Sequence, residues 1–273
     1  LKLKIITFDS KEGKEIYWHS SSHILAMAVT ELFKAKPTIG PSIDFGFYYD
    51  FDSAPFTQDD IQKIEKKVEE IIKKDIPFER QEISKAEAKK LFKDNPYKIE
   101  LINDVVDDKV SIYKNAEFFD LCRGPHVPST GKIKAFKIMK FAGAYWRGDS
   151  NNKMLQRIYG VSFNDKKELD NYLKLLEEAE KRDHRKIGKE LNLFSFHEEA
   201  PGMPFFHAKG MVIWNELMKV WREEHDKAGY VEIKTPIILN QKLWVQSGHW
   251  DHYKDSMYFT KIDNAEYALK PMN

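Results

Sequence analysis

The spacing of apolar side chains along the chain predicts a mixture of helices and strands. Apolar residues recur every three to four positions in four segments that are predicted to be helices: 20–33, 58–74, 165–182 and 208–228. Alternating patterns, or runs of β-branched and aromatic residues, predict strands over 2–8, 97–102, 110–119, 135–161, 230–234 and 267–269. The segment 37–56 is rich in glycine, proline and aromatic residues and is predicted to be a loop followed by a strand.

Short sequence signals place several helix ends. Ser20–Ser22 offer side-chain oxygens that could cap the first helix, so we expect it to begin there. Ser84 and Glu87 have the spacing of a capping box and predict a further short helix, which should end before Pro96. Gly229 follows the last long helix, at a position where glycine commonly ends a helix.

The chain has 273 residues, enough for about two domains. No run approaches the roughly 18 consecutive apolar residues of a membrane span, and the first residues do not resemble a signal or transit peptide. The single cysteine, Cys122, cannot form a disulfide within the chain, which favours a reducing compartment. We therefore expect a cytoplasmic protein without a membrane partner.

The net charge is only +1, but basic residues are concentrated in one segment. Residues 132–157 contain seven lysines or arginines and one acidic residue, with aromatic side chains among them. This basic segment is either an ordinary solvated strand face over a core or a phosphate-binding surface with groups that stack on bases. The pattern alone leaves both interpretations open.

Four side chains with nitrogen or sulfur donor atoms form the principal candidate site. His19 and His23 have the i, i+4 spacing that places two imidazoles on one helix face. Cys122 is followed four residues later by His126, on a loop that contains glycine and proline. Such a set is typical of a tetrahedral zinc site or of a hydrolytic pocket. A zinc protease needs a glutamate directly after the first histidine, and Ser20 at that position argues against one.

Two charged residues are further candidates. Asp120 lies beside the Cys122 loop, where a carboxylate can orient a histidine or hold a substrate amine. Lys98 lies on the predicted strand 97–102 and should point away from its apolar face, where it could bind phosphate or stabilise a developing negative charge. The alternative for both residues is an ordinary surface charge. A second group of histidines, in 247–253, lacks obvious partners for a metal and is expected to be a packed loop.

Several of these motifs, in this order, resemble threonyl-tRNA synthetases. They include His-Ser-Ser-Ser-His at 19–23, Asp-Leu-Cys-Arg-Gly-Pro-His at 120–126 and Ala-Leu-Lys-Pro-Met-Asn at 268–273. Further matching segments are 39–50, 142–149, 154–160, 184–188, 234–236 and 247–250. The resemblance therefore extends over nearly the whole chain.

The resemblance implies an α+β fold in four parts: 1–8, 9–164, 165–183 and 184–273. The first would be the end of a ubiquitin-like domain, the second an editing domain of mixed strands and helices, and the third a linker helix. The last would be the opening part of the antiparallel-sheet catalytic domain of class II synthetases, which forms homodimers in the family. The chain ends at Asn273, before the family's zinc-binding cysteine and ATP-binding motifs, so we expect it not to activate threonine.

The family joins threonine to its tRNA with ATP, magnesium and zinc, and it hydrolyses mischarged seryl-tRNA. Serine lacks one methyl group of threonine, a difference worth only roughly 1–3 kcal/mol in a pocket, so a second, smaller pocket is needed. The resemblance places six residues there: His19, His23, Lys98, Asp120, Cys122 and His126. His19 with Lys98 would position or activate the water and the ribose hydroxyls, and Asp120 would hold the serine amine or hydroxyl. The other three would shape the pocket.

We expect the editing site to need no metal, although zinc would suit its four donor atoms. We also expect the basic segment to hold the acceptor end of threonine-specific tRNA through six residues: Lys137, Lys140, Tyr145, Arg147, Lys153 and Arg157. Two other functions stay open. The chain could be a free-standing zinc-dependent editing hydrolase, or a non-catalytic RNA-binding module with a structural zinc.

Overall fold

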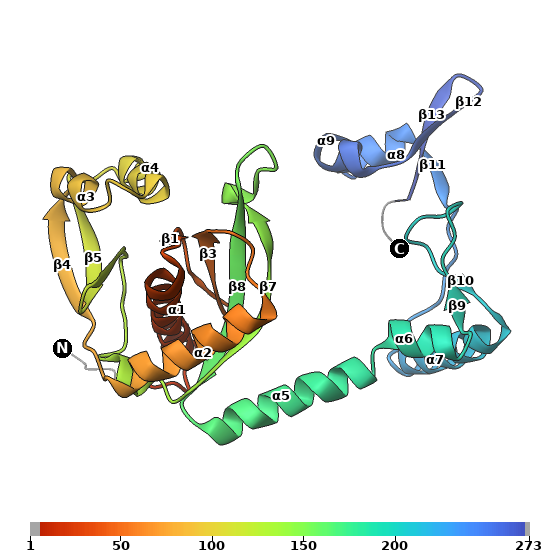
Figure 1. Cartoon of the computed structure of the whole chain (residues 1–273). Helices are drawn as coiled ribbons and strands as arrows, with labels where there is room; N and C mark the ends of the chain where they lie inside the picture. Colours follow the sequence, from red (N-terminus) through yellow and green to blue (C-terminus); the bar gives the residue numbers. More distant parts are fainter. Residues whose placement is uncertain (1–5, 271–273) are drawn as a thin grey trace. The chain divides into compact units, whose positions relative to one another are not determined.

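The computed structural model describes residues 6–270, which divide after Lys181 into two compact units (Figure 1). Every pair of strands described is antiparallel, and helices pack against the sheets of the first unit, so the expected α+β class is confirmed. Within residues 6–270, no helix combines the length and the apolar composition that crossing a bilayer requires.

A five-stranded sheet forms the centre of the first unit. Its strands are β1 (Lys36–Pro37), β2 (Ser42–Ile43), β3 (Gly46–Asp52), β7 (Ala135–Tyr145) and β8 (Met154–Phe163). They follow the order β1-β3-β8-β7, and β2 also pairs with β3. Alternate residues of β3 are buried on the core side, which leaves Tyr48, Asp50 and Asp52 on the opposite face of the sheet.

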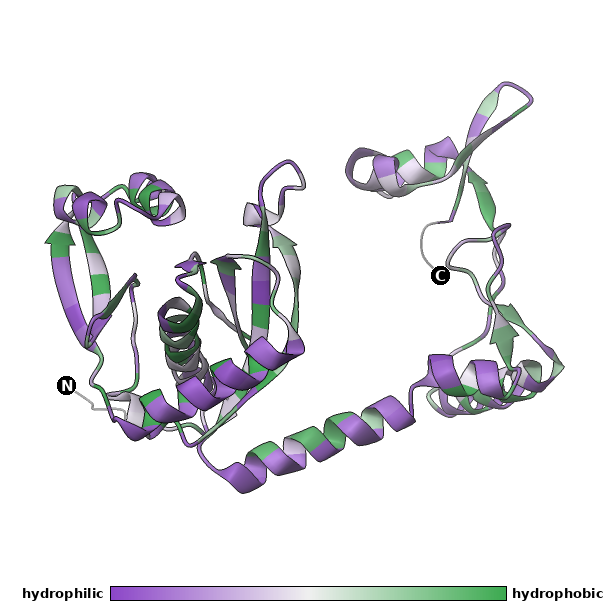
Figure 2. Ribbon diagram, viewed as in Figure 1, coloured by the Kyte–Doolittle hydropathy of each residue, from purple (hydrophilic) through white to green (hydrophobic). Residues whose placement is uncertain are grey.

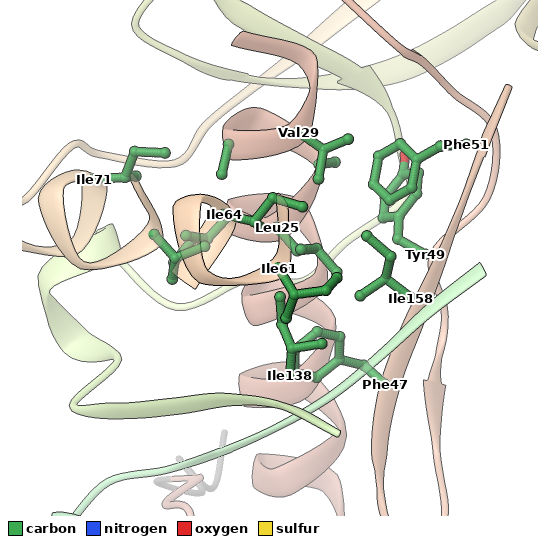
Figure 3. Close-up of a cluster of buried hydrophobic side chains, with 14 of the residues drawn as sticks. Leu25, Val29, Phe47, Tyr49, Phe51, Ile61, Ile64, Ile71, Ile138 and Ile158 are labelled. Atoms are coloured by element: carbon green, nitrogen blue, oxygen red, sulfur yellow. The ribbon is translucent and has the colours of Figure 1, made fainter. Parts of the chain in front are cut away.

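Two helices, α1 (Lys11–Phe33) and α2 (Gln58–Lys73), enclose the core with this sheet. Helix α2 turns an apolar stripe inward and keeps a largely polar outer side, as Figure 2 shows. In Figure 3, side chains of both helices meet those of the sheet: Leu25, Val29, Phe47, Tyr49, Phe51, Ile61, Ile64, Ile71, Ile138 and Ile158. Burying each such side chain stabilises the fold by roughly 1.5–3 kcal/mol relative to exposing it.

A smaller sheet of three strands carries the candidate loop, residues 122–128, which contains Cys122 and His126. It consists of β4 (Glu79–Ser84), β5 (Lys109–Asn115) and β6 (Phe118–Leu121), in the order β4-β5-β6. Helices α3 (Lys85–Leu91) and α4 (Pro96–Asp104) share an apolar cluster with it. Ser84 and Glu87 form the predicted capping box at the start of α3, which is confirmed. A short 3-10 helix, η1 (Thr130–Lys132), precedes β7, and another, η2 (Trp146–Gly148), follows it.

Helix α5 (Lys166–Lys181) ends the first unit and contributes Leu169 to a cluster with β7 and β8. The elements of the second unit are α6 (His184–Glu190), β9 (Phe194–Ser195), β10 (Phe205–Phe206), α7 (Ala208–Lys227), β11 (Ile238–Asn240), α8 (Gln241–Gln246), α9 (His249–Tyr253), η3 (Lys254–Ser256), β12 (Phe259–Ile262) and β13 (Ala265–Leu269). Its strands form a two-stranded sheet, β10-β9, and a three-stranded sheet, β11-β13-β12.

The expected start of the first helix at Ser20–Ser22 is wrong. Helix α1 begins nine residues earlier, at Lys11, and Ser10 caps it by accepting a hydrogen bond from the Gly13 amide at 3.1 Å. Ser20–Ser22 lie inside the helix and are fully buried. Serine is tolerated there because each hydroxyl donates back to a backbone carbonyl of the helix.

The predicted strand 97–102 is wrong as well, since Lys98 lies in helix α4. The Asn95 side chain accepts a hydrogen bond from the Lys98 amide at 3.3 Å, and Pro96 occupies the first helical position. Proline is well suited to that position because its missing amide proton would have no partner there. Six residues are too few to distinguish the two-residue period of a strand from the 3.6-residue period of a helix.

The predicted strand 230–234 also differs from the structure. Gly229 follows α7 in a left-handed conformation, with φ of 80°, and so ends it as predicted. Residues 230–236 then form no regular element and pair with no strand of the described chain. Of the predicted strand 2–8, residues 6–8 are not in a strand, and the remainder lies outside the described residues.

Candidate active site

Six side chains from distant parts of the first unit lie together. His19 and His23 project from α1 and Lys98 from α4, whereas Asp120 belongs to β6 and Cys122 and His126 to the loop that follows it. All six residues singled out in the sequence are thus brought into one cluster, even though Lys98 arrives there from a helix.

Three histidines and the cysteine form the first half of the cluster. One donor atom of each of these four side chains lies within 4.8 Å of all the others. The Cys122 sulfur is 3.2 Å from Nε2 of His126 and 3.4 Å from Nε2 of His19. The imidazole rings of His23 and His126 meet edge to face, with centroids 4.3 Å apart. The i, i+4 spacing on α1 therefore places both histidines on the side of the helix that faces the loop.

The loop geometry depends on Gly124. Its φ of 72° lies in the left-handed region, and its amide donates to the Cys122 sulfur at 3.2 Å. A Cβ atom at this position would lie 2.1 Å from the Tyr113 hydroxyl. The Tyr113 ring packs edge-on against the His126 ring at 4.4 Å, so a side chain at residue 124 would displace a wall of the site.

A buried ion pair forms the second half of the cluster. Lys98 and Asp120 are each only 2% exposed, and the Lys98 ammonium contacts Oδ1 of Asp120. The hydroxyl of Tyr49 donates to Oδ2 of the same carboxylate and lies 3.3 Å from the Lys98 ammonium. Nε2 of His23 lies 3.8 Å from Oδ2, which joins the two halves.

The histidines are held in their neutral form. Burial lowers the pKa of His19, although the nearby carboxylate of Asp120 opposes the shift. Burial, together with the neighbouring His19 and Lys98, lowers the pKa of His23 well below its usual value. The pKa of His126 is lowered by burial and by the two other rings. Neutral imidazoles can accept protons or bind a metal at neutral pH.

Cys122 is buried, and burial raises the pKa of its thiol to about 12, although the Gly124 amide opposes this shift. A thiol that keeps its proton at neutral pH is a poor nucleophile, so Cys122 does not have the character of a catalytic cysteine. The four-donor set nevertheless fits zinc, which prefers imidazole nitrogen and thiolate sulfur and deprotonates a thiol that it binds. Nδ1 of His23 is buried without a hydrogen-bond partner among the described residues.

A cleft of about 690 Å³ opens beside Cys122. It is lined by residues of α4, of the three-stranded sheet and of the candidate loop, among them Leu101, Ser111 and Arg123. Of the six cluster residues, Cys122 is therefore the one that borders this cleft. A substrate that enters the cleft would meet the cluster at Cys122.

Three of the six basic-segment residues, Lys140, Lys153 and Arg157, lie on the sheet face that carries Asp50 and Asp52, whereas Lys137 lies beside α2 and Arg147 beside α4. Four of the six bind carboxylates: Lys137 with Glu65 (2.9 Å), Arg147 with Glu100 (2.8 Å), Lys153 with Asp52 (2.7 Å) and Arg157 with Asp50 (2.7 Å). Lys140 lies 4.5 Å over the Tyr159 ring, and Tyr145 is 40% exposed.

Three contributors to the site were not identified from the sequence. Tyr49 donates a hydrogen bond to Asp120, Phe78 stacks on His126 with ring centroids 4.8 Å apart, and Tyr113 meets the same ring edge-on. Tyr49 lies in a strand of alternating buried residues, which predicts that it is buried but not which carboxylate it meets. Phe78 and Tyr113 carry no local signal for this role, because their partner lies 48 and 13 residues away in the sequence.

Comparison with known proteins agrees with the motifs. Residues 110–159 match the protein family described as "Threonyl and Alanyl tRNA synthetase second additional domain". Over 277 aligned residues, the whole chain is 61% identical to the threonine–tRNA ligase of Caldanaerobacter subterraneus subsp. tengcongensis and 60% identical to that of Clostridium tetani. The chain belongs to the threonyl-tRNA synthetase family.

The chain covers 43% of the length of these two threonyl-tRNA synthetases. It is also similar to a solved structure titled as the RNA binding domain of threonyl-tRNA synthetase from Cryptosporidium parvum Iowa II. That match has 39% identity and a TM-score of 0.33, and it covers 34% of this chain and 23% of the other. Asp120, Cys122 and His126 lie within the segment that matches the family domain.

Replacing Lys98 with methionine should destabilise the first unit by about 3–5 kcal/mol, because the Asp120 carboxylate would stay buried without its cation. The double variant Lys98→Met/Asp120→Asn should lose less free energy of unfolding than the two single variants lose together. Hydrogen exchange of the buried α1 amides in increasing urea measures the free energy of unfolding of this unit.

The matched control for Lys98 is Lys63→Met, since Lys63 is 63% exposed and pairs with Asp60 at 3.2 Å. That variant should change the stability by less than about 1 kcal/mol. A Lys98→Met variant as stable as the wild type would contradict a structural role for the buried pair.

The neutral histidines predict a dependence of stability on pH. In the unfolded chain each ring titrates near pH 6.5, whereas the folded pKa values of His19, His23 and His126 are lower. Below about pH 6.5 the unfolded chain therefore binds more protons than the folded one, and stability falls by up to about 1.4 kcal/mol per pH unit for each ring. Well above that pH the three rings are neutral in both states and do not make the stability depend on pH.

Urea unfolding at pH 7.5, 6.5 and 5.5 measures this slope. In the His126→Gln variant, this slope below pH 6.5 should be smaller by the contribution of about one proton. Equal stability of the wild type at pH 5.5 and pH 7.5 would show that the three rings are not held neutral by the fold.

Proposed function

We propose that this chain hydrolyses the ester that joins serine to the terminal adenosine of threonine-specific tRNA. The observation that carries the proposal is the single cluster formed by the ion pair, the three neutral imidazoles and the thiol beside an open cleft. The family to which the chain belongs supports it, because three members of the cluster lie in the segment shared by threonyl- and alanyl-tRNA synthetases.

The two halves of the cluster suit the two ends of this substrate. Asp120 offers a buried carboxylate that can bind the serine ammonium or hydroxyl group, with Lys98 and Tyr49 holding it in place. His19 is the least enclosed member of the cluster on α1, and its neutral imidazole can accept a proton from water. Lys98 can also stabilise negative charge that develops on the ester oxygen.

The reaction then proceeds without a further reactant. A water molecule loses a proton to the His19 imidazole as its oxygen bonds to the ester carbon. The bond between that carbon and the ribose oxygen breaks, and the imidazolium returns the proton to the ribose oxygen. The products are free serine and tRNA with an intact terminal hydroxyl group. His23, Cys122 and His126 shape the pocket around the serine side chain and exclude the methyl group of threonine.

The acceptor end of the tRNA would contact the basic segment. Lys140 and Tyr145 suit this role best, because neither has a carboxylate partner within residues 6–270 and both are exposed. Lys137, Arg147 and the other two basic residues would first have to exchange a carboxylate for a phosphate. A tyrosine ring can stack on a base of a single strand.

For the whole protein, we propose ATP-dependent ligation of threonine to its tRNA, with magnesium and zinc, in a cytoplasmic homodimer without a membrane partner. The similarity of this chain to the two threonine–tRNA ligases described above supports this proposal. Residues 9–164 would be the editing domain, 165–183 a linker helix and 184–273 part of the catalytic domain, after a remnant of another domain in 1–8. The division of the structure after Lys181 is compatible with these limits.

Deacylation of threonine-specific tRNA charged with radioactive serine tests the proposal. The wild-type chain should release serine faster than threonine, and His19→Ala should slow serine release by about 100-fold or more, since general base catalysis contributes 10²–10⁴-fold. His184→Ala, outside the cluster, should hydrolyse at the wild-type rate. A His19→Ala variant with full activity would remove His19 from the mechanism.

Metal removal separates the hydrolase from the zinc-dependent alternatives, for which the four-donor set is the supporting observation. After dialysis against a zinc chelator, with zinc measured by mass spectrometry, the wild-type chain should keep its rate of seryl-tRNA hydrolysis. A zinc-dependent editing hydrolase would instead lose its activity and regain it with added zinc. An RNA-binding module with structural zinc would never hydrolyse the ester, and both chelation and Cys122→Ala would lower its melting temperature.

A further inference from the structure

Ser20 lies between the two site histidines on α1 and is fully buried. Its hydroxyl oxygen contacts three polar atoms. It lies 2.7 Å from the carbonyl oxygen of Ile16, 3.0 Å from the amide nitrogen of Val127 and 3.1 Å from Nδ1 of His126. The last two belong to the candidate loop, so this one hydroxyl connects the helix to the loop.

The number of available protons determines the direction of each hydrogen bond. A serine hydroxyl has a single proton, and a carbonyl oxygen has none. The 2.7 Å contact with Ile16 therefore takes the hydroxyl proton. The Val127 amide donates its own proton to the same oxygen. The contact with His126 is then favourable only if Nδ1 of the ring carries a proton and donates it to Ser20.

The opposite nitrogen of the ring faces the pocket. A neutral imidazole has one ring proton in total, and the contact with Ser20 assigns it to Nδ1. With that proton on Nδ1, Nε2 has a free lone pair, and it lies 3.2 Å from the Cys122 sulfur. A thiol carries one proton, and the Cys122 thiol can donate it to this lone pair. A continuous series of hydrogen bonds thus connects Ile16, Ser20, His126 and Cys122.

We propose that Ser20 is a positioning residue that fixes His126 in the tautomer with its proton on Nδ1 and so presents Nε2 to the pocket as an acceptor. The side chain of Cys122 is then held by donating to His126 and by accepting from the Gly124 amide. Without the serine, the ring is free to move its proton to Nε2, where it would compete with the thiol proton. The significance of this tautomer for hydrolysis rests on the function proposed above, but the tautomer itself does not.

The neighbouring serine provides a matched control. Ser21 is equally buried on the same helix, but its hydroxyl contacts the Tyr17 carbonyl at 2.9 Å and the Ser162 hydroxyl at 2.6 Å, and no imidazole. Ser21→Ala therefore removes a buried helical hydroxyl without touching His126. Ser20→Thr keeps a hydroxyl at the position in question and serves as the conservative variant.

The experiment is nitrogen NMR of the full chain with ¹⁵N-labelled histidine, in which protonated and unprotonated ring nitrogens have well-separated chemical shifts. His126→Gln assigns the signals of residue 126. The wild type, Ser20→Thr and Ser21→Ala should show His126 protonated on Nδ1, whereas Ser20→Ala should shift protonation towards Nε2. A wild-type ring protonated on Nε2 overturns the proposal, whether or not the variants fold. A Ser20→Ala ring that keeps the wild-type tautomer also overturns it.

Seryl-tRNA hydrolysis distinguishes this inference from the proposed function. Ser20→Ala should slow deacylation by about 10–100-fold, the usual cost of removing a group that orients a functional histidine, and Ser20→Thr should retain most of the rate. A wild-type chain with the expected tautomer but no hydrolysis contradicts the proposed function and leaves the role of Ser20 intact. An altered tautomer at an unchanged rate contradicts the importance of Ser20 for hydrolysis.

Discussion

The buried carboxylate of Asp120 determines how the first unit is arranged. Removing a carboxylate from water costs several kcal/mol, and only a close cation and well-directed hydrogen bonds offset this cost. Lys98 supplies the cation from α4, and Tyr49 supplies a hydrogen bond from β3. Since Asp120 itself belongs to β6, this one charge links α4 to a strand of each sheet. The positions of these elements are therefore coupled to the integrity of the site.

The three histidines next to this ion pair are buried without a charge, in contrast to Asp120. Their rings pack against one another, and burial favours the neutral form of each ring; for His23 the nearby Lys98 adds to this effect. The site thus combines a fixed negative charge at one end with neutral acceptors at the other. An amino acid ester has the matching polarity, because its ammonium group needs a carboxylate and its carbonyl carbon needs a water whose proton can be accepted.

Part of the fold could be predicted from the sequence because helices such as α2 are amphipathic and several helix caps are local. Helix α2 and the Ser84–Glu87 capping box depend on residues within a few positions of one another. Lys98 was predicted in a strand because six residues do not distinguish periods of 2 and 3.6, and the cap at Asn95 was the stronger signal. The site could be identified because histidine and cysteine side chains, which carry nitrogen and sulfur donor atoms, recur at a spacing of four residues in two places. Tyr49 and Phe78 were missed because their roles arise from contacts between distant segments.

The basic segment illustrates why local charge in a sequence is not the same as surface potential. Its net charge of +6 is opposed in the fold by carboxylates of β3, α2 and α4, which are distant in sequence. Arg157 is held by both oxygens of Asp50 and stacks on Tyr48, so it acts first as part of the sheet. Phosphates would gain little from residues already paired in this way. The surface potential of this unit therefore follows from the contacts of the folded chain and not from the count of basic residues in one segment.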